Sequence, residues 1–259
     1  MKISVLQPRY PSDGDSEGAF ERLLTMYKDA PPSDITVLPE FSNAPGIGDR
    51  AALAQFTARS TPRLLDAATH REGISFVCGA FDNRNSILAL GGGKELFRYD
   101  KCHLTDAETD DLGLDDGYAR SVKAFEYGGV RYCFLTCFDI YFPELLASIA
   151  LQKPDVIILP TYQRRETAQA ITLQCRFLAY TADAYVLRSS FSLGEGSSTG
   201  GNSLVATPEG EILENMGQRV GVLTLEIDPH QKRQLKNPGL YWTQHRRPDA
   251  YPNGNESRK

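Results

Sequence analysis

Short apolar runs alternate with amphipathic segments of helical length along almost the whole chain, and this alternation limits the folds open to it. Runs rich in β-branched, aromatic and aliphatic residues predict buried strands, whereas apolar residues spaced three and four apart predict helices. The predicted strands cover residues 2–7, 34–40, 74–81, 86–90, 95–99, 130–136, 155–160, 184–189, 203–207 and 221–227. The predicted helices cover residues 17–30, 51–56, 62–70, 145–151 and 167–181, with Thr61 as a candidate cap before Pro62. This alternation indicates an α/β protein.

Two of the predicted strands share a pattern about half the chain apart. The two similar segments are Asp34-Ile-Thr-Val-Leu-Pro-Glu40 and Asp155-Val-Ile-Ile-Leu-Pro-Thr161. Two similar strands that end at the same face suit a two-layer sheet sandwich with pseudo-symmetric halves. No linker rich in serine, glycine or proline divides the chain, which favours one domain.

Composition excludes several classes of function. The 259 residues include 41% hydrophobic and 24% charged residues, the balance of an ordinary globular protein. The formal net charge of −5 comes without basic clusters, so we expect no nucleic-acid partner. The apolar run at the start is too short for a signal peptide, and no run is long enough to span a membrane. The unpatterned cysteines indicate reduced thiols, and we expect a cytoplasmic protein.

Cys137 stands where a buried strand turns into a helix. The predicted strand over 130–136 precedes it, and Pro143 and Glu144 suit the first turn of the helix that follows. Such a turn carries unpaired backbone N–H groups, which favour both a thiolate and an oxyanion. This position is typical of a nucleophile. The alternative is a buried cysteine of the core, since most free cysteines are of that kind.

Glu40 and Lys101 also lie at the ends of predicted strands. Taken singly, Glu40 reads as a loop carboxylate and Lys101 as a surface lysine. Together with Cys137 they supply the parts of a cysteine amidohydrolase. The carboxylate takes the proton of the thiol, the ammonium stabilises the tetrahedral oxyanion, and the thiol attacks the carbonyl.

Three blocks of the sequence resemble, in order and in spacing, the signature blocks of the nitrilase superfamily of carbon–nitrogen hydrolases. They are Leu38-Pro-Glu40, Tyr99-Asp-Lys101-Cys-His-Leu104 and Cys137-Phe-Asp-Ile-Tyr-Phe-Pro-Glu144. Further similarities are Gly201-Asn-Ser203, Pro208-Glu-Gly210-Glu-Ile-Leu213 and Arg246-Arg-Pro-Asp-Ala-Tyr251. The resemblance implies a single domain over residues 1–251, followed by a polar tail over residues 252–259.

The resemblance also implies a four-layer α-β-β-α sandwich and a Glu-Lys-Cys catalytic set. Glu40 would be the general base, Lys101 the cation that stabilises the oxyanion, and Cys137 the nucleophile. The backbone N–H of Phe138 would be a second oxyanion donor. Attack on an amide would give a thioester, which water then hydrolyses, so we expect no cofactor and no metal.

A second glutamate follows the lysine block in many members of this family. Glu108 has the lysine-to-glutamate spacing of one common subgroup, and it would orient Lys101 or the substrate nitrogen. Asp110 competes for this role, because the distance from Glu108 to Gly117 is about two residues longer than in that pattern. A loop acid without a catalytic role is the plain alternative for Glu108.

Departures from the family pattern concern the substrate and the subunit contacts. Many members carry an arginine four residues after the cysteine, where this chain has Tyr141, which is a candidate substrate-binding residue. Arg164 and Arg165 are candidate replacements, since a guanidinium suits a carboxylate, although both residues also suit a solvated helix start. The Glu-Asn pair common near the end of the next helix is Thr181-Ala182 here. That segment often contributes to dimer contacts in the family, and we expect a homodimer or larger homo-oligomer.

These features predict hydrolysis of a small linear carboxamide to ammonia and a carboxylate. An N-carbamoyl amine or amino acid amidohydrolase, a nitrile hydrolase, and an acyl transferase that uses the same thioester are alternatives within the family. Outside enzymes, the alternative is a catalytically idle scaffold that binds a partner. The presence of Glu40, Lys101 and Cys137 together argues against the scaffold.

Overall fold

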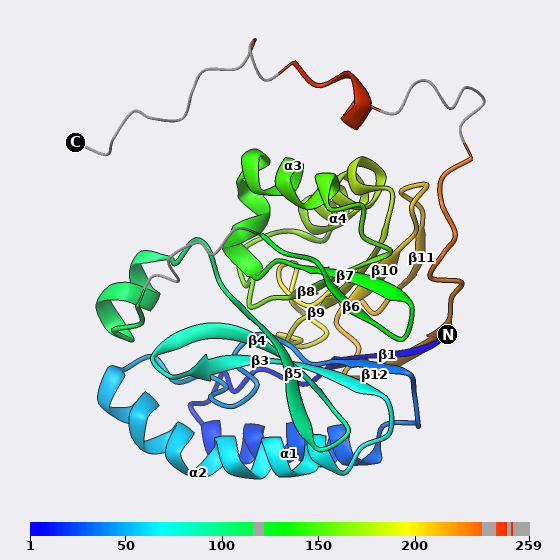
Figure 1. The fold of residues 1–259 in the computed structure, drawn as a ribbon. Helices are drawn as coiled ribbons and strands as arrows, with labels where there is room; N and C mark the ends of the chain where they lie inside the picture. Colours follow the sequence, from blue (N-terminus) through cyan, green and yellow to red (C-terminus); the bar gives the residue numbers. More distant parts are fainter. Residues whose placement is uncertain (116–121, 235–241, 248–249, 251–259) are drawn as a thin grey trace.

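The computed structural model describes residues 1–115, 122–234, 242–247 and 250, and its elements form four layers (Figure 1). Two six-stranded sheets face each other, and a pair of helices covers the outer face of each sheet. Helices α1 (Ser16–Asp29) and α2 (Arg50–Thr69) cover one sheet, and α3 (Pro143–Leu151) and α4 (Ala168–Ala182) cover the other. The arrangement confirms the predicted α-β-β-α sandwich.

The two sheets have matching topologies. The first has the order β12-β1-β2-β3-β4-β5, formed by Gly221–Glu226, Lys2–Gln7, Ile35–Val37, Ile74–Phe81, Arg84–Gly91 and Lys94–Asp100. The second has the order β11-β10-β9-β8-β7-β6, formed by Ile212–Asn215, Leu204–Ala206, Tyr185–Ser189, Val156–Pro160, Val130–Phe134 and Phe125–Tyr127. Strands β1, β2 and β3 are parallel, as are β7, β8 and β9. The two similar segments of sequence contain β2 and β8, the middle strands of these parallel sets.

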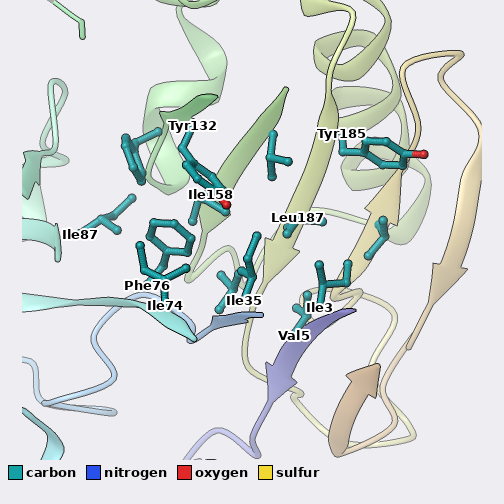
Figure 2. Packing of buried hydrophobic residues seen from close by; sticks show 14 of the residues in the cluster. Ile3, Val5, Ile35, Ile74, Phe76, Ile87, Tyr132, Ile158, Tyr185 and Leu187 are labelled. Carbon is teal, nitrogen blue, oxygen red and sulfur yellow. The ribbon is translucent and has the colours of Figure 1, made fainter. Parts of the chain in front are cut away.

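The core between the sheets is built from alternate side chains of their strands. Figure 2 shows Ile35 and Phe76 of the first sheet opposite Ile158 and Leu187 of the second. Successive side chains on a strand point to opposite faces, so Val77, next to Phe76, packs under α1 and α2 instead. Central strands buried on both faces read as unbroken apolar runs, which is why they are visible in the sequence.

Strands β6 and β11 were not predicted from the sequence. They form the two opposite edges of the second sheet, and their residues are exposed or half-buried. Each has only one covered side, and β6 consists of just Phe125-Glu-Tyr127. Neither strand needs a continuous apolar run, so neither leaves a strong pattern in the sequence.

Helix α2 corrects the prediction of two helices separated before Pro62, because a single helix runs through both segments. Pro62 has no N–H to bond the carbonyl of Ala58, but both residues are exposed, so the freed carbonyl faces solvent. Thr61 is not a cap; its hydroxyl accepts a hydrogen bond from Asn43 Nδ2 at 2.8 Å. The stripe buried against the sheet is unbroken across the proline and consists of Leu53, Phe56, Ser60, Leu64 and Ala68.

Within the described ranges, no helix is long and apolar enough to cross a membrane. The polar tail predicted over residues 252–259 lies outside the described residues, so its boundary and the single domain over 1–251 stay predictions. Gly117, which bears on the choice between Glu108 and Asp110, also lies outside them.

The position of Pro62 predicts a stabilising substitution. A proline inside a helix is about 3 kcal/mol less favourable than alanine. Part of that gain is lost because alanine leaves the unfolded chain more flexible, by about 0.4–1 kcal/mol. We expect Pro62→Ala to raise the free energy of unfolding by about 2–2.6 kcal/mol, measured by urea denaturation.

The control is Pro31→Ala, in the extended segment between α1 and β2. The carbonyl of Pro31 accepts from Ser33 and Arg71, and alanine keeps that carbonyl. Only the flexibility of the unfolded chain changes there, so a small loss of stability is expected. A loss at Pro62 as well would show that the proline is accommodated without cost.

Candidate active site

Glu40, Lys101, Glu108 and Cys137 line one cavity of about 340 Å³. Glu40 follows β2, Lys101 follows β5, and Cys137 follows β7. Strands β2 and β5 run in the same direction in the first sheet, because the intervening pairings are one parallel and two antiparallel. Their carboxyl ends therefore meet at one edge of that sheet, and β7 brings Cys137 to the same cavity from the second sheet.

Lys101 is almost fully buried and bonds to both carboxylates. Its Nζ lies 2.9 Å from Oε1 of Glu40, and 2.9 and 2.7 Å from Oε1 and Oε2 of Glu108. Burial would lower the pKa of Lys101, but Glu40, Cys137 and Glu108 raise it above its usual range. Lys101 therefore keeps its positive charge in a site that excludes most water.

The two carboxylates differ in how many donors they receive. Glu108 Oε2 also accepts from the backbone N–H and the hydroxyl of Thr105, both at 2.9 Å. Glu40 Oε2 is buried and has no hydrogen-bond partner. Burial raises the pKa of Glu40 above its usual value although Lys101 opposes it, whereas Lys101 and Thr105 overcome burial and lower the pKa of Glu108. Glu40 is thus the carboxylate suited to accept a proton, and Glu108 the one that stays ionised.

Cys137 has a left-handed backbone, with φ of 46°, which is rare for a residue with a side chain. The turn leads from β7 into a short 3₁₀ helix, Cys137–Tyr141, and the thiol is partly exposed to the cavity. Burial and the charge of Glu40 raise its pKa well above the usual range, and Lys101 and the backbone of Tyr162 offset this only in part. The thiol therefore keeps its proton until a base removes it.

Phe138 lies in the first turn of this 3₁₀ helix. The N–H groups at the start of a helix have no partner within it. The next N–H, that of Asp139, bonds the carbonyl of Thr136 at 3.0 Å. The candidate oxyanion donor thus belongs to the same turn as the thiol.

Asp139 is a residue of the site that the sequence-based reasoning missed. Its buried carboxylate accepts from Tyr99 at 2.7 Å, from the backbone and ring of His103 at 2.9 Å each, and from the Thr136 N–H at 3.1 Å. It therefore ties the segment on either side of Lys101 to the turn that carries Cys137. The pattern Thr136-x-x-Asp139, typical of a helix cap, is the signal that was available in the sequence.

Asn85 is the second missed residue, and it lies at the start of β4. Its Nδ2 is 2.7 Å from Glu40 Oε1 and 2.6 Å from Glu108 Oε1. A single buried asparagine in a hairpin carries no recognisable pattern. Only the fold brings it between two carboxylates that are far from it in the sequence.

The candidate substrate-binding residues separate into two groups. Arg164 lines the cavity, and its guanidinium lies over the rings of Tyr10 and Tyr162, at 5.3 and 4.8 Å. Tyr141 and Arg165 do not line it; the Tyr141 hydroxyl donates to Glu166 at 2.6 Å and the Arg165 side chain is exposed.

Asp110, the competitor of Glu108, is exposed and lies outside the lining of the cavity. Its carboxylate accepts a hydrogen bond from the neighbouring Thr109 hydroxyl at 3.1 Å. The geometry therefore favours Glu108 as the second carboxylate. Among the residues described, no three metal-ligating side chains are grouped so that they could hold an ion.

Residues 2–237 match the family described as carbon-nitrogen hydrolase. The fold and the match together define the class: a nitrilase-like sandwich that cleaves carbon–nitrogen bonds. The chain belongs to the carbon–nitrogen hydrolase family.

Two curated relatives of the chain are named as amidases. The 2-oxoglutaramate amidase of Bacillus subtilis is 25% identical over 255 residues, covering 90% of this chain and 93% of that protein. The deaminated glutathione amidase of Synechocystis sp. is 24% identical over 225 residues, covering 79% and 83%. The protein is therefore a hydrolase of carbon–nitrogen bonds other than peptide bonds, similar to relatives that are named as amidases.

Solved structures share the fold. An amidase variant from Nesterenkonia AN1, of the nitrilase superfamily, matches with a TM-score of 0.76 and 17% identity, covering 96% of this chain and 95% of that one. Saccharomyces cerevisiae Nit3 matches with a TM-score of 0.68 and 23% identity, covering 88% and 90%. In another variant of the Nesterenkonia amidase, the acetamide moiety of fluoroacetamide is covalently attached to the active-site cysteine.

The contacts of Asp139 predict how strongly the site depends on it. In Asp139→Asn, an –NH₂ group replaces one carboxylate oxygen. Each oxygen of Asp139 accepts from two donors, so this –NH₂ group would face two donors and could accept from neither. We expect a loss of about 2–4 kcal/mol in the free energy of unfolding, measured by urea denaturation, because buried donors lose their acceptor. Tyr99→Phe, which removes only one hydroxyl donor, should cost about 1 kcal/mol. Equal losses in the two variants would contradict the bridging role.

Proposed function

We propose that the protein hydrolyses a small linear carboxamide to ammonia and a carboxylate through a thioester on Cys137. The observation that carries this proposal is Glu40 Oε2, a buried carboxylate oxygen without a partner in the cavity that the protonated thiol lines. A cavity of about 340 Å³ is at the small end of ligand pockets, which favours a small substrate.

The reaction begins when Glu40 Oε2 takes the proton of Cys137 as the sulfur attacks the amide carbon. The new oxyanion is stabilised by the Lys101 ammonium and the Phe138 N–H. Glu40 then gives the proton to the leaving nitrogen, and the carbon–nitrogen bond breaks to release ammonia. A water molecule, deprotonated by the same carboxylate, attacks the thioester and frees the carboxylate product and the thiol.

Glu108 has a supporting role in this scheme. Its contact with Lys101 holds the ammonium in place, and its low pKa keeps it ionised. The site contains two carboxylates and one ammonium, so the scheme requires that only Glu40 carries a proton during the cycle. Asp110 has no role in it.

Arg164 is the residue that we propose to bind the far end of the substrate. It lines the cavity, and the Tyr10 hydroxyl accepts a hydrogen bond from its Nη1 at 3.1 Å, which fixes the guanidinium plane. The aromatic rings of Phe41 and Tyr162 pack against each other, with centroids 6.1 Å apart, and both residues line the same cavity. An amide whose short apolar chain ends in a carboxylate fits such a site. Relatives named for 2-oxoglutaramate and deaminated glutathione support amides as substrates.

The expected homodimer has a candidate contact surface on α4. Leu173, Phe177 and Tyr180 are exposed there by 68%, 57% and 49%. Residues with this spacing lie on one side of a helix, so they form a continuous apolar stripe. The oligomeric state stays a prediction, as does the cytoplasmic location.

Cys137→Ala and Cys137→Ser should abolish ammonia release with an unchanged circular dichroism spectrum. Lys101→Met should lower kcat about a hundredfold or more, the cost of losing an oxyanion donor. Ammonia release is measured over a panel of amides, ureido acids and nitriles. Preference for ureido acids or nitriles would replace the carboxamide proposal, and full activity of Cys137→Ala would overturn the mechanism.

The role of Glu40 is tested separately, by alkylation of Cys137 with fluoroacetamide. Because the pKa of Glu40 lies above its usual value, the rate should rise with pH through a midpoint higher than that of an ordinary glutamate. Below that midpoint Glu40 is protonated and cannot accept the thiol proton. Glu40→Gln should alkylate slowly at all these pH values, and a rate indifferent to this change would contradict base catalysis.

Arg164→Gln tests the proposed carboxylate subsite. A hydrogen bond to a charged group contributes about 1.5–3 kcal/mol, so KM for a carboxylate-bearing amide should rise about 10- to 150-fold. The KM for a neutral amide of equal length should change little. The control is Arg59→Gln, an exposed arginine on α2. Equal effects on both substrates would exclude the subsite while leaving the hydrolysis itself untouched.

A further inference from the structure

The side chain of Asn85 lies between the two buried carboxylates and is itself only 1% exposed. Its Nδ2 donates to Oε1 of Glu40 at 2.7 Å and to Oε1 of Glu108 at 2.6 Å. Lys101 Nζ donates to the same two oxygens, at 2.9 Å each. Each Oε1 atom therefore has two donors, one from the amide and one from the ammonium.

These donors decide which oxygen has room for a proton. An amide –NH₂ and an ammonium can only donate, so a proton added to either Oε1 would face two hydrogens. Oε2 of Glu108 is also occupied, by Lys101 and by two donors of Thr105. Glu40 Oε2 is the remaining carboxylate oxygen of the pair, and it has no partner.

We propose that Asn85 is a positioning residue that directs the catalytic proton to Oε2 of Glu40 and keeps Glu108 ionised. The inference rests on the proposed function, because it specifies where the base of that reaction holds the proton. Thiol and carboxylate exchange one proton, from Cys137 Sγ to Glu40 Oε2, and the same oxygen returns it to the leaving nitrogen. The negative charge that the thiol would gain passes to the substrate oxyanion, and no other side chain of the site changes its charge.

The orientation of the Asn85 amide is fixed from behind. Cys78 Sγ lies 3.5 Å from Oδ1 of Asn85, and burial raises the pKa of this thiol well above its usual range. Cys78 therefore remains a donor, which turns the amide oxygen toward it and the –NH₂ toward the carboxylates. The backbone carbonyl of Asn85 also accepts from the Lys101 N–H at 2.8 Å, so both donors are held by one strand pair.

A neutral donor suits this position better than a second cation would. Another ammonium would lower the pKa of Glu40 so strongly that the carboxylate would be a poor base. An amide occupies Oε1 and adds no charge. Asn85 thus separates the two carboxylates while leaving Glu40 able to accept a proton.

The test uses Asn85→Asp and Asn85→Leu, two changes of similar volume. A third carboxylate in Asn85→Asp repels the ionised form of Glu40, so the acid midpoint of Cys137 alkylation by fluoroacetamide should move up by about one pH unit or more. Asn85→Leu removes one donor from Glu40 Oε1, so its midpoint should also rise, by less.

The matched control is Asn215→Asp, which makes the same charge change in β11. Asn215 Oδ1 accepts from the Gly217 N–H at 2.9 Å, and aspartate keeps that acceptor. Its alkylation midpoint should equal that of the wild type. Thermal unfolding of every variant separates loss of fold from a shift in midpoint. If Asn85→Asp does not fold, Asn85→Leu alone decides by its midpoint.

The outcomes distinguish this inference from the proposed function. Slower alkylation by Asn85→Asp and Asn85→Leu with an unmoved midpoint would reduce Asn85 to a packing role and overturn the inference. Amide hydrolysis by the wild type would still stand in that case. Conversely, the wild type could release no ammonia from any amide while the two Asn85 variants show the shifted midpoints. That result would refute the proposed substrate class and keep the role of Asn85.

Discussion

The ion triad of Lys101 with Glu40 and Glu108 is the interaction on which the rest of the site depends. Removing charges from water is costly unless each finds a partner with good geometry, and one unpaired charge left behind costs several kcal/mol. Here each carboxylate lies within 3 Å of one ammonium. The carboxyl ends of β2 and β5 must therefore stay in register, so the packing of the first sheet and the chemistry of the cavity are not separable.

Much of the fold follows from the sequence because its central strands are buried on both faces. Strand β8 is a continuous apolar run and β3 is interrupted only by Ser75, and the alternation of such strands with helices indicates the α/β class directly. What cannot be predicted lies where burial is partial. The edge strands β6 and β11 have no apolar run, and the unbroken α2 depends on a freed carbonyl at Ala58 that faces solvent.

The candidate site shows the same division. Glu40, Lys101 and Cys137 were predicted because each ends a recognisable strand and because three short blocks resemble a known family. Asn85 and Asp139 were not, since their partners are distant in sequence or belong to backbone N–H groups. The choice between Glu108 and Asp110 also required three dimensions, because only the fold shows which of two nearby acids is turned toward Lys101.

The bridge made by Asp139 explains how a strained turn is kept in place. A residue with a side chain in the left-handed region costs about 1–3 kcal/mol, and the surrounding structure must hold it there. Asp139 does so from two sides. It accepts from the Thr136 N–H, just before Cys137 in the chain. It also accepts from Tyr99 and His103, which flank Lys101 in the sequence. The second sheet supplies the thiol and the first supplies the ammonium, so this one carboxylate couples the two sheets. The distance between the Cys137 thiol and the Lys101 ammonium is thereby set by the packing of the two sheets and not by a flexible loop.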